Sequence, residues 1–193
     1  GLLKARSSGR MEVYENADKR ITAIVDYAHN RMSFENLFKS VRQEYPSRKV
    51  AIVFGCPGNK ALIRRKDLGE ISGQYADMVY ITEEDPGEEP LQKISREIAD
   101  FVEAENGNYK IIDDRGEAIS TAINEMGADS VILITGKGNE TRQKRGIEYI
   151  DCPTDVEYAT KAIKEYDKAH GLDSNKKIKS VQDILPQLHK LHN

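Results

Sequence analysis

The segment Val50-Ala51-Ile52-Val53-Phe54-Gly55-Cys56-Pro57-Gly58 decides the fold class, because an unbroken apolar run leads directly into a glycine-bearing turn. A short, nearly continuous run rich in β-branched residues is typical of a strand covered on both faces of a parallel sheet. Four further runs of this kind occur in the chain, at residues 22–25, 78–81, 109–112 and 131–134. These five runs predict the central strands of a parallel sheet.

Amphipathic helical periods separate the five runs. Apolar residues recur at three- and four-residue spacing from Phe34 to Tyr45, and Ser33 precedes them as a candidate N-cap. Gly127 follows another such period, at the place where a C-cap glycine is favoured. Besides the period that begins at Phe34, helical periods cover residues 68–75, 91–101, 118–126 and 156–166, and Gly127 follows the third of these. Strands and helices therefore alternate, which predicts βαβ units.

We accordingly expect an α/β, Rossmann-like three-layer domain, with a mostly parallel sheet of about six strands and helices on both faces. Ile147 and Tyr149 alternate with polar neighbours, as in an edge strand. Residues 1–8 are polar and basic and are interpreted as a linker remnant, and residues 9–170 as the domain. Residues 171–193 are predicted to form a helical tail, because an apolar stripe follows a polar break there.

The composition excludes several classes of protein. The chain has 193 residues, of which 38% are hydrophobic, and its 29 basic and 32 acidic residues give a net charge of −3. The basic residues are scattered, so no nucleic acid is expected as a partner. The apolar runs are too short for membrane insertion. Two cysteines cannot build a disulfide scaffold, and a reduced, cytoplasmic compartment is the simplest interpretation.

Every predicted strand leads into a polar or glycine-bearing segment, and in open α/β sheets ligands bind beyond the carboxyl ends of the strands. A site for a charged or zwitterionic small molecule is one interpretation, and ordinary polar surface loops are the alternative. The chain lacks both a P-loop and a dinucleotide-binding glycine motif. Its four histidines do not have the spacing of metal ligands, so no metal site is expected here.

Five motifs occur in an order and at a spacing that resemble the C-terminal domain of Mur ligases. They are Gly9-Arg10-Met11-Glu12, Val25-Asp26-Tyr27-Ala28-His29-Asn30, Phe54-Gly55-Cys56, Asp85-Pro86, and Gly136-Lys137-Gly138-Asn139-Glu140 with Gln143. The match covers roughly residues 9 to 167. The branch that it resembles most is the UDP-N-acetylmuramoyl-tripeptide synthetases, which add the third residue of the peptidoglycan stem peptide.

This resemblance implies an ATP-dependent amide ligase of three domains, of which the chain is the third. ATP would phosphorylate a D-glutamyl carboxylate of a UDP-N-acetylmuramoyl dipeptide, and the amine of a diamino acid would attack the acyl phosphate. The central domain would supply the P-loop and the ligands of Mg²⁺. The present domain would close over the site as a lid, and the resemblance assigns it no catalytic residue of its own.

The resemblance assigns three residues to ATP. Arg10 matches the family arginine that reaches the nucleotide, which suits the fixed donor fork of a guanidinium. Asp26 matches a carboxylate that accepts from ribose hydroxyls, and His29 lies on the same turn as a donor to ATP. The alternatives are a surface arginine beside a linker and a structural histidine. Residues 30–32 depart from the family's Thr-Pro-Asp, which puts the adenine pocket in question.

It also assigns residues to the incoming amino acid. Arg65 matches the arginine that holds its carboxylate, in the bidentate geometry that arginine favours. The neighbouring Arg64 is the alternative counterpart. Glu140 matches the glutamate that meets an ammonium group, and Gly136 matches the glycine that lines the pocket. The alternative for both is a glycine-rich turn with a solvated acid.

Asp85, Pro86 and Gly87 complete the predicted amino-acid site and contain its main departure. Diaminopimelate-adding members have Asn-Pro-Arg here, and the arginine grips the distal carboxylate. Lysine-adding members lack that arginine, as this chain does at Gly87. Because an unpaired carboxylate is costly to bury, we expect L-lysine to be favoured over meso-diaminopimelate.

Two alternatives remain open. A related amide ligase, of the cyanophycin or folylpolyglutamate synthetase type, shares part of the motif set. A non-catalytic Rossmann-like module that senses a nucleotide or amino acid is the other. We expect the isolated chain to fold and Cys56 to be an inert thiol. As a ligase domain the isolated chain should bind ATP only weakly and lack catalytic activity, whereas tight binding or turnover would favour the independent module.

Overall fold

The computed structural model describes residues 11–60 and 62–172. Six strands form the main sheet in the order β1-β2-β6-β3-β4-β5. Their bounds are β1 Glu12–Glu15, β2 Ile21–Asp26, β3 Lys49–Phe54, β4 Met78–Ile81, β5 Tyr109–Ile111 and β6 Ser130–Thr135. Neighbouring strands are parallel except for β1, which runs antiparallel to β2. The predicted α/β class and mostly parallel sheet are confirmed.

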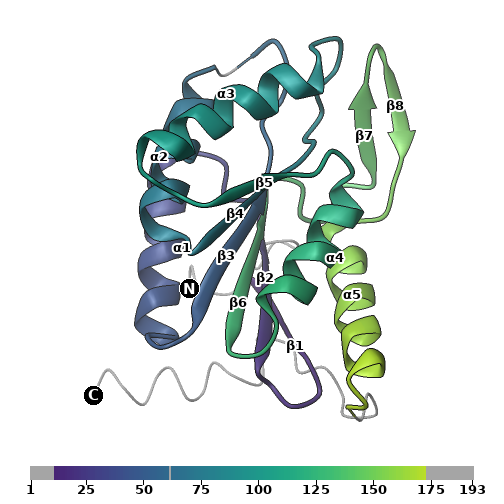
Figure 1. Cartoon of the computed structure of the whole chain (residues 1–193). Helices are drawn as coiled ribbons and strands as arrows, with labels where there is room; N and C mark the ends of the chain where they lie inside the picture. The colour runs from purple at the N-terminus through teal and green to yellow at the C-terminus, as the bar shows by residue number, and fades with distance from the viewer. Residues whose placement is uncertain (1–10, 61, 173–193) are drawn as a thin grey trace, which may run out of the picture.

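Five helices cover the two faces of this sheet (Figure 1). Helices α1 (Arg31–Glu44), α2 (Leu62–Tyr75) and α3 (Leu91–Ala104) pack on one face and bury Phe34, Leu68 and Ile98 against it. Helices α4 (Arg115–Met126) and α5 (Asp155–Ala169) bury Ile119 and Ile163 on the other face. Successive residues of a strand point to opposite faces of the sheet. In β3, for example, Val50 and Ile52 belong to the first core and Ala51 and Val53 to the second.

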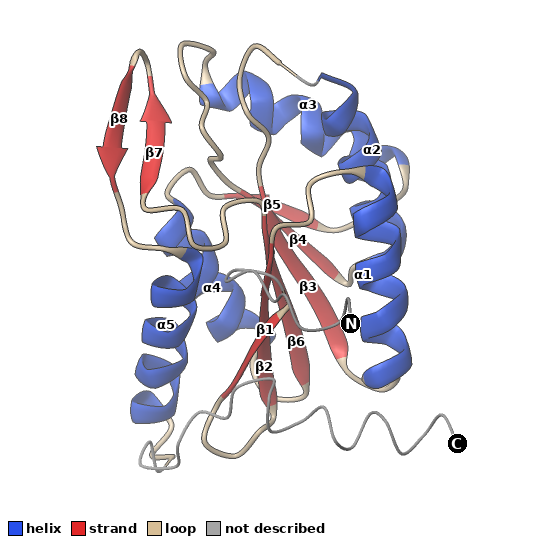
Figure 2. Ribbon diagram, turned by 180° about the vertical axis from the view of Figure 1, so that it is seen from behind, coloured by secondary structure: helices blue, strands red, loops and turns tan. Residues whose placement is uncertain are grey.

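The sixth strand of the sheet differs from the one that was expected. β1 fills this place, although its four residues are only half-buried and contain no apolar run. Ile147 and Tyr149 lie instead in a separate antiparallel hairpin, β7 (Arg142–Arg145) and β8 (Glu148–Asp151), where Tyr149 belongs to β8 and Ile147 to the turn. The edge-strand prediction is therefore correct only for Tyr149, and in another sheet. Figure 2 shows the hairpin standing beyond the end of the main sheet.

The helix ends follow ordinary capping chemistry, with one correction. Asn30, and not Ser33, is the N-cap of α1: its side-chain oxygen accepts from the Ser33 amide at 3.0 Å, and Ser33 Oγ accepts in return from the Asn30 amide at 3.1 Å. This reciprocal pair is a capping box, which begins the helix earlier than predicted. Gly127 caps α4 with a φ of 58°, as expected.

Some expectations fall outside the described residues. The linker at 1–8 precedes them, and nearly all of the tail at 171–193 follows them. Within the described part of the chain, no helix has both the length and the apolarity needed to cross a bilayer.

Candidate functional site

The loops that carry the predicted site residues meet at the carboxyl edge of the sheet. After β5 the chain crosses to the other face through α4 and returns to the middle of the sheet as β6, so the strand order reverses between β3 and β6. Ligands of open α/β folds bind at such a switch point. Hydrogen bonds join the loops there: the Gly136 amide donates to the Asp26 carbonyl at 3.2 Å, and the Gly58 amide to the Asp85 carbonyl at 3.2 Å.

Asp26 and His29 form one turn at the end of β2. The Asp26 carboxylate accepts from the Ala28 amide at 2.7 Å and from the Met11 amide at 2.8 Å, which fixes the chain that enters β1 beside the end of β2. The ring of exposed His29 is oriented by a contact of 2.7 Å between Nδ1 and the Tyr27 carbonyl. With Nδ1 protonated for that bond, Nε2 is left for another partner. Arg10 lies outside the described residues.

Arg65 is engaged within the protein. Its side chain is 1% exposed, and its two terminal nitrogens contact the Glu89 carboxylate at 3.0 and 2.7 Å. Nη1 also donates to Glu97 at 2.6 Å. The Arg65 pair lowers the pKa of Glu89 well below its usual range. The guanidinium that was predicted to hold a ligand carboxylate therefore already holds two carboxylates of α3 and the loop before it.

The neighbouring Arg64 is less fully engaged. Its side chain is 19% exposed, its Nη2 lies 3.4 Å from Glu84, and its buried Nε has no hydrogen-bond partner in residues 11–60 and 62–172. A guanidinium with spare donors at the switch point can take a bidentate carboxylate. Arg65 Nε also lacks a partner in the described residues, but both terminal nitrogens of Arg65 are paired, so Arg64 is the more available of the two arginines.

Glu84 is a site residue that the sequence reasoning did not single out. It is buried beside Gly136, where a Cβ would come within 2.2 Å of Glu84 Oε2, so only glycine leaves room for this carboxyl. Burial raises the pKa of Glu84 to about 7, and nearby Arg64 opposes the shift. A buried carboxyl with this pKa is suited to receive a cationic group. Its neighbours in the sequence, Glu83 and Asp85, are also acidic, so sequence alone gave it no distinction.

Asp85 fastens the loop after β4. Its backbone adopts a φ of 46°, and its carboxylate accepts from Lys137 Nζ at 2.9 Å and from the Lys144 amide at 2.8 Å. The Asp85 carboxylate is thus directed at the protein. Pro86 lies so close to Gly58 that a Cβ at residue 58 would meet the Pro86 carbonyl at 1.8 Å. Gly87, with a φ of 59°, exchanges backbone hydrogen bonds with the β7–β8 hairpin.

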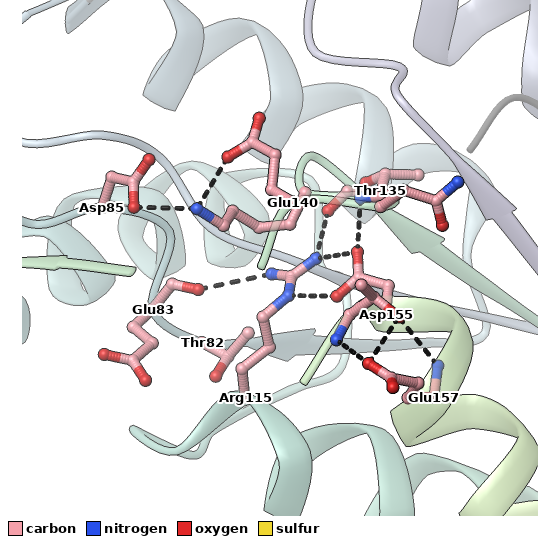
Figure 3. Close-up of polar contacts among 12 residues, drawn as sticks. Thr82, Glu83, Asp85, Arg115, Thr135, Glu140, Asp155 and Glu157 are labelled. Atoms are coloured by element: carbon pink, nitrogen blue, oxygen red, sulfur yellow. Dashed lines mark hydrogen bonds and ion pairs between the residues drawn. The ribbon is translucent and has the colours of Figure 1, made fainter. Parts of the chain in front are cut away.

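Lys137 joins the two loops of the predicted amino-acid site. Its buried ammonium lies 2.8 Å from Glu140 and 2.9 Å from Asp85, so it links the loop after β6 to the loop after β4 (Figure 3). Glu140 is exposed and keeps room for another cation. The structure thus brings Asp85, Gly136 and Glu140 together, with Glu84 packed against Gly136.

A buried ion pair lies beneath these loops. Arg115 and Asp155 begin helices α4 and α5, and their side chains are 5% and 1% exposed. Figure 3 shows Arg115 meeting Asp155, the Glu83 carbonyl and the Thr135 carbonyl at once. Arg115 follows the apolar run at residues 109–112 by three positions, but nothing in the sequence indicates these partners.

A pocket of about 390 Å³ opens beside Gly87, lined by Glu83, Pro86, Gly87, Glu89, Leu91, Asp113, Asp114 and Arg145. Four of the lining side chains are acidic, and Arg145 is the one cation among them. Arg145 Nε donates to Glu83 at 2.9 Å, so this cation is already paired. Glu89 is likewise paired with Arg65, so Asp113 and Asp114, whose partners are uncharged, are the carboxylates that make the lining acidic overall.

Two further expectations concern metals and thiols. No group of three or more potential metal-ligating side chains occurs in the residues that the structure describes. Cys56 is buried, and burial raises the pKa of its thiol, which keeps it in the unreactive protonated form at neutral pH.

The sheet, its switch point and the charged loops define an open α/β domain of the Rossmann-like class, with its site at the carboxyl edge. The model of the family "Mur ligase, glutamate ligase domain" matches residues 9–138. The chain therefore belongs to the Mur ligase family and corresponds to its glutamate ligase domain.

Similar proteins agree with this assignment. UDP-N-acetylmuramoyl-L-alanyl-D-glutamate–2,6-diaminopimelate ligase of Clostridioides difficile is 39% identical over 70% of the chain and 28% of its own length. UDP-N-acetylmuramoyl-L-alanyl-D-glutamate–L-lysine ligase of Enterococcus faecalis is 37% identical over 82% of the chain and 31% of its own length. A solved diaminopimelate ligase superimposes with a TM-score of 0.73 and 25% identity, over 83% of the chain and 32% of that structure. The chain thus spans about a third of each of these proteins.

Proposed function

We propose that the chain is the C-terminal domain of an ATP-dependent ligase that adds the third stem-peptide residue to UDP-N-acetylmuramoyl-L-alanyl-D-glutamate in the cytoplasm. The observation that carries this proposal is that both sequence relatives described above bear names of ligases for that acceptor. ATP would activate the D-glutamyl carboxylate as an acyl phosphate, and the amino acid would displace phosphate. The rest of the polypeptide would hold the phosphates and Mg²⁺.

The ATP contacts of this domain are assigned to Arg10, Asp26 and His29. The turn at the end of β2 supports this role because Asp26 is held by two backbone amides and keeps lone pairs for ribose hydroxyls. The Nδ1 contact of His29 makes Nε2 an acceptor in the neutral ring, which suits an amino group of the base, and a donor only in the imidazolium.

The amino acid is assigned to the space between Arg64, Glu84, Gly136 and Glu140. Arg64 is 19% exposed and makes one long contact of 3.4 Å to Glu84, which leaves it available for the carboxylate. Arg65, the residue assigned from the sequence, would act by holding Glu89 and the loop that carries Gly87. Glu84 and Glu140 supply two carboxylates for the ammonium groups of a diamino acid. Asp85 and Pro86 would shape the loop and not touch the ligand.

L-Lysine is proposed as the preferred amino acid over meso-diaminopimelate. A second carboxylate near residue 87 would face the acidic pocket described above, and its one cation, Arg145, is already bound to Glu83. An unpaired carboxylate in such a space loses more hydration than it regains. An ammonium group gains from the same surroundings.

The test is amino-acid-dependent ADP release by the full-length ligase, with L-lysine and meso-diaminopimelate compared at equal concentrations. We expect faster turnover with lysine. Gly87→Arg should shift the preference toward diaminopimelate, and Gly171→Arg is the matched control, because Gly171 has a similar φ of 65° and open space around it. Equal or faster wild-type turnover with diaminopimelate would refute the lysine preference.

The isolated chain offers a separate test of the domain assignment. Without the phosphate-binding domain it should bind Mg-ATP no more tightly than roughly 1 mM, about 4 kcal/mol, and should not hydrolyse it. Isothermal titration of the 193-residue chain measures this. Micromolar binding, or turnover that persists through repurification, would favour an independent nucleotide-sensing module instead.

A further inference from the structure

We propose that Arg115 and Asp155 are positioning residues for the amino-acid site, which hold the loop after β4 and the loop after β6 at a fixed separation. The proposal rests on the proposed function, because it assumes that these two loops carry the amino acid. Neither side chain is expected to touch the ligand. Their action is to fix the places of Glu84, Gly136 and Glu140 before the ligand arrives.

Arg115 connects two strand ends to one helix. Its Nε and Nη2 donate to the Asp155 carboxylate at 2.6 and 2.7 Å, Nη2 also donates to the Thr135 carbonyl at 2.7 Å, and Nη1 reaches the Glu83 carbonyl at 3.3 Å. Thr135 ends β6 and directly precedes Gly136, and Glu83 directly precedes Glu84. Each carbonyl thus belongs to the peptide bond that leads into a residue of the candidate site.

Asp155 holds the next part of the same turn. Its Oδ2 accepts from the Gly138 amide at 2.9 Å, and its own amide donates to the Gly138 carbonyl at 3.0 Å. Gly138 has a φ of 53°, and a Cβ there would meet the Tyr27 ring at 2.8 Å. Both backbone polar groups of Gly138 therefore end on Asp155, which sets the direction in which the chain continues to Glu140.

Stability alone does not account for this arrangement. Taking two charges out of water costs several kcal/mol per ion, and a buried pair is often no more stabilising than apolar side chains of similar volume. An apolar pair, however, would leave the carbonyls of Glu83 and Thr135 and the Gly138 amide without these partners. Arginine is suited to the task because its planar fork offers five donors, whereas the lysine ammonium is a compact charge with three.

The consequence for the reaction is geometric. Glu84 and Glu140 come from loops that follow different strands, and a ligand that contacts both depends on their separation. A displacement of about 1 Å caused by a change remote from the chemistry can cost roughly 100-fold in rate. The ion pair should therefore influence the use of the amino acid much more than the use of ATP, because the side chains of Asp26 and His29 are oriented by their own hydrogen bonds to Met11, Ala28 and Tyr27.

The test is a kinetic comparison of Arg115→Lys and Asp155→Asn in the full-length ligase. We expect the KM for the amino acid to rise about 10- to 100-fold while the KM for ATP changes less than about threefold. Asp167→Asn is the matched control: Asp167 is equally buried and accepts from Asn16 Nδ2 at 3.0 Å and the Ala17 amide at 2.9 Å, remote from the site loops. It should lower the melting temperature without raising the KM for the amino acid.

A double variant, Arg115→Met with Asp155→Leu, removes both charges and separates positioning from stability. It should retain a cooperative unfolding transition and still show the raised KM. The proposal is overturned if this variant keeps the wild-type KM, or if Arg115→Lys and Asp155→Asn raise it no more than Asp167→Asn does.

A readout independent of turnover distinguishes failure of this proposal from failure of the proposed function. If the wild-type ligase releases no ADP in response to an amino acid, the proposed function fails. Hydrogen exchange in peptides covering residues 136–140 then still reports on the ion pair. We expect faster exchange in Asp155→Asn than in Asp167→Asn, and equal exchange in both would refute the positioning role.

Discussion

Ion pairs at the amino ends of the sheet strands (the amino edge) and at their carboxyl ends (the carboxyl edge) differ in solvent exposure. At the amino edge, Arg20 and Asp129 pair with side chains that are 54% and 61% exposed. At the carboxyl edge, the paired side chains of Arg65 and Glu89 are only 1% and 5% exposed. Exposed pairs contribute little and cost little, whereas buried charges carry a desolvation penalty that geometry must offset. The buried pair lies beside the loops of the candidate site, so its desolvation cost falls where the proposed function depends most on the geometry of those loops.

The largest difference between the edges should come from removing one arginine at each. Arg65→Met leaves the buried Glu89 carboxylate with Lys93 as its remaining cation and should lower the free energy of unfolding by about 3–5 kcal/mol. Arg20→Met should have little effect on the free energy of unfolding, because its ion pair with Asp129 is exposed to solvent. Urea unfolding of the 193-residue chain measures both. The contrast fails if the two losses are equal. Adding Glu89→Leu to Arg65→Met should recover part of the stability that Arg65→Met alone loses.

The burial of Glu84 should make the free energy of unfolding depend on pH. Its pKa in the folded chain is about 7, against an ordinary value of 4.5, so folding takes up a proton between these values. The contribution of Glu84 to stability is therefore fully present in acid and is lost as the pH rises through about 7. The shift corresponds to about 3 kcal/mol between about pH 4 and pH 8.

The measurement is the pH dependence of unfolding in the wild type and in Glu84→Gln. The stability of the variant relative to the wild type should improve as the pH rises over that interval. Asp129 should give the opposite sign and at lower pH: the hydrogen bond from Arg20 lowers its pKa from an ordinary 3.8, so its contribution is present above that value and is lost as the pH falls below it. If the difference between wild type and Glu84→Gln does not vary with pH, the buried ionisation assigned to Glu84 is wrong.

Much of the fold could be predicted from the sequence because the signals were local. Four of the five predicted strands, those observed as β2, β3, β4 and β6, lie inside the sheet and are buried as their apolar runs indicate, and each helix shows its apolar period. The prediction of a central strand at residues 109–112 is wrong, because β5 lies at the edge of the sheet and its Lys110 and Ile111 are exposed. β1 carries neither signal: its residues Glu12–Glu15 are half-buried, and its pairing with β2 is a tertiary contact. The hairpin strand containing Tyr149 resembles an edge strand equally well in either sheet, so alternation alone could not place it.

The end of the sheet at which the candidate site residues gather could be predicted from the sequence, but the contacts that each residue makes could not. Parallel strands end at one edge, and this rule brought Asp26, Asp85 and Gly136 to the same edge without any distance information. The choice between Arg64 and Arg65 depends on which side of α2 meets Glu89, a contact across 24 residues. Burial of Glu84 against Gly136 likewise depends on a long-range contact, between the loops that follow β4 and β6. Such long-range pairs are fixed by packing, and the residue types alone do not indicate them.

The smallest predicted effect compares two glycines with positive φ. Gly146, at the hairpin turn, has a φ of 59° and nothing within 4 Å of the place that a Cβ would occupy, so Gly146→Ala should cost roughly 1–2 kcal/mol from backbone strain alone. Gly136 has a φ of 108°, and its Cβ would also displace the Glu84 carboxylate. We therefore expect Gly136→Ala to lower the free energy of unfolding more than Gly146→Ala does. Its cost should be about 1–3 kcal/mol of backbone strain, together with the loss of the contact between Glu84 and Arg64.

Urea unfolding gives the two costs, and a second substitution identifies the source of the excess. Glu84→Asp shortens the side chain that a Cβ at residue 136 would strike, so the double variant Gly136→Ala, Glu84→Asp should lose less stability than the sum of the two single changes. Glu84→Asp combined with Gly146→Ala should be additive, because no atom near Gly146 belongs to Glu84. Additive costs in both pairs would mean that Gly136 is required only for its backbone conformation. Coupling in the first pair alone would mean that the glycine is there to admit the buried carboxyl, as the proposed ammonium site requires.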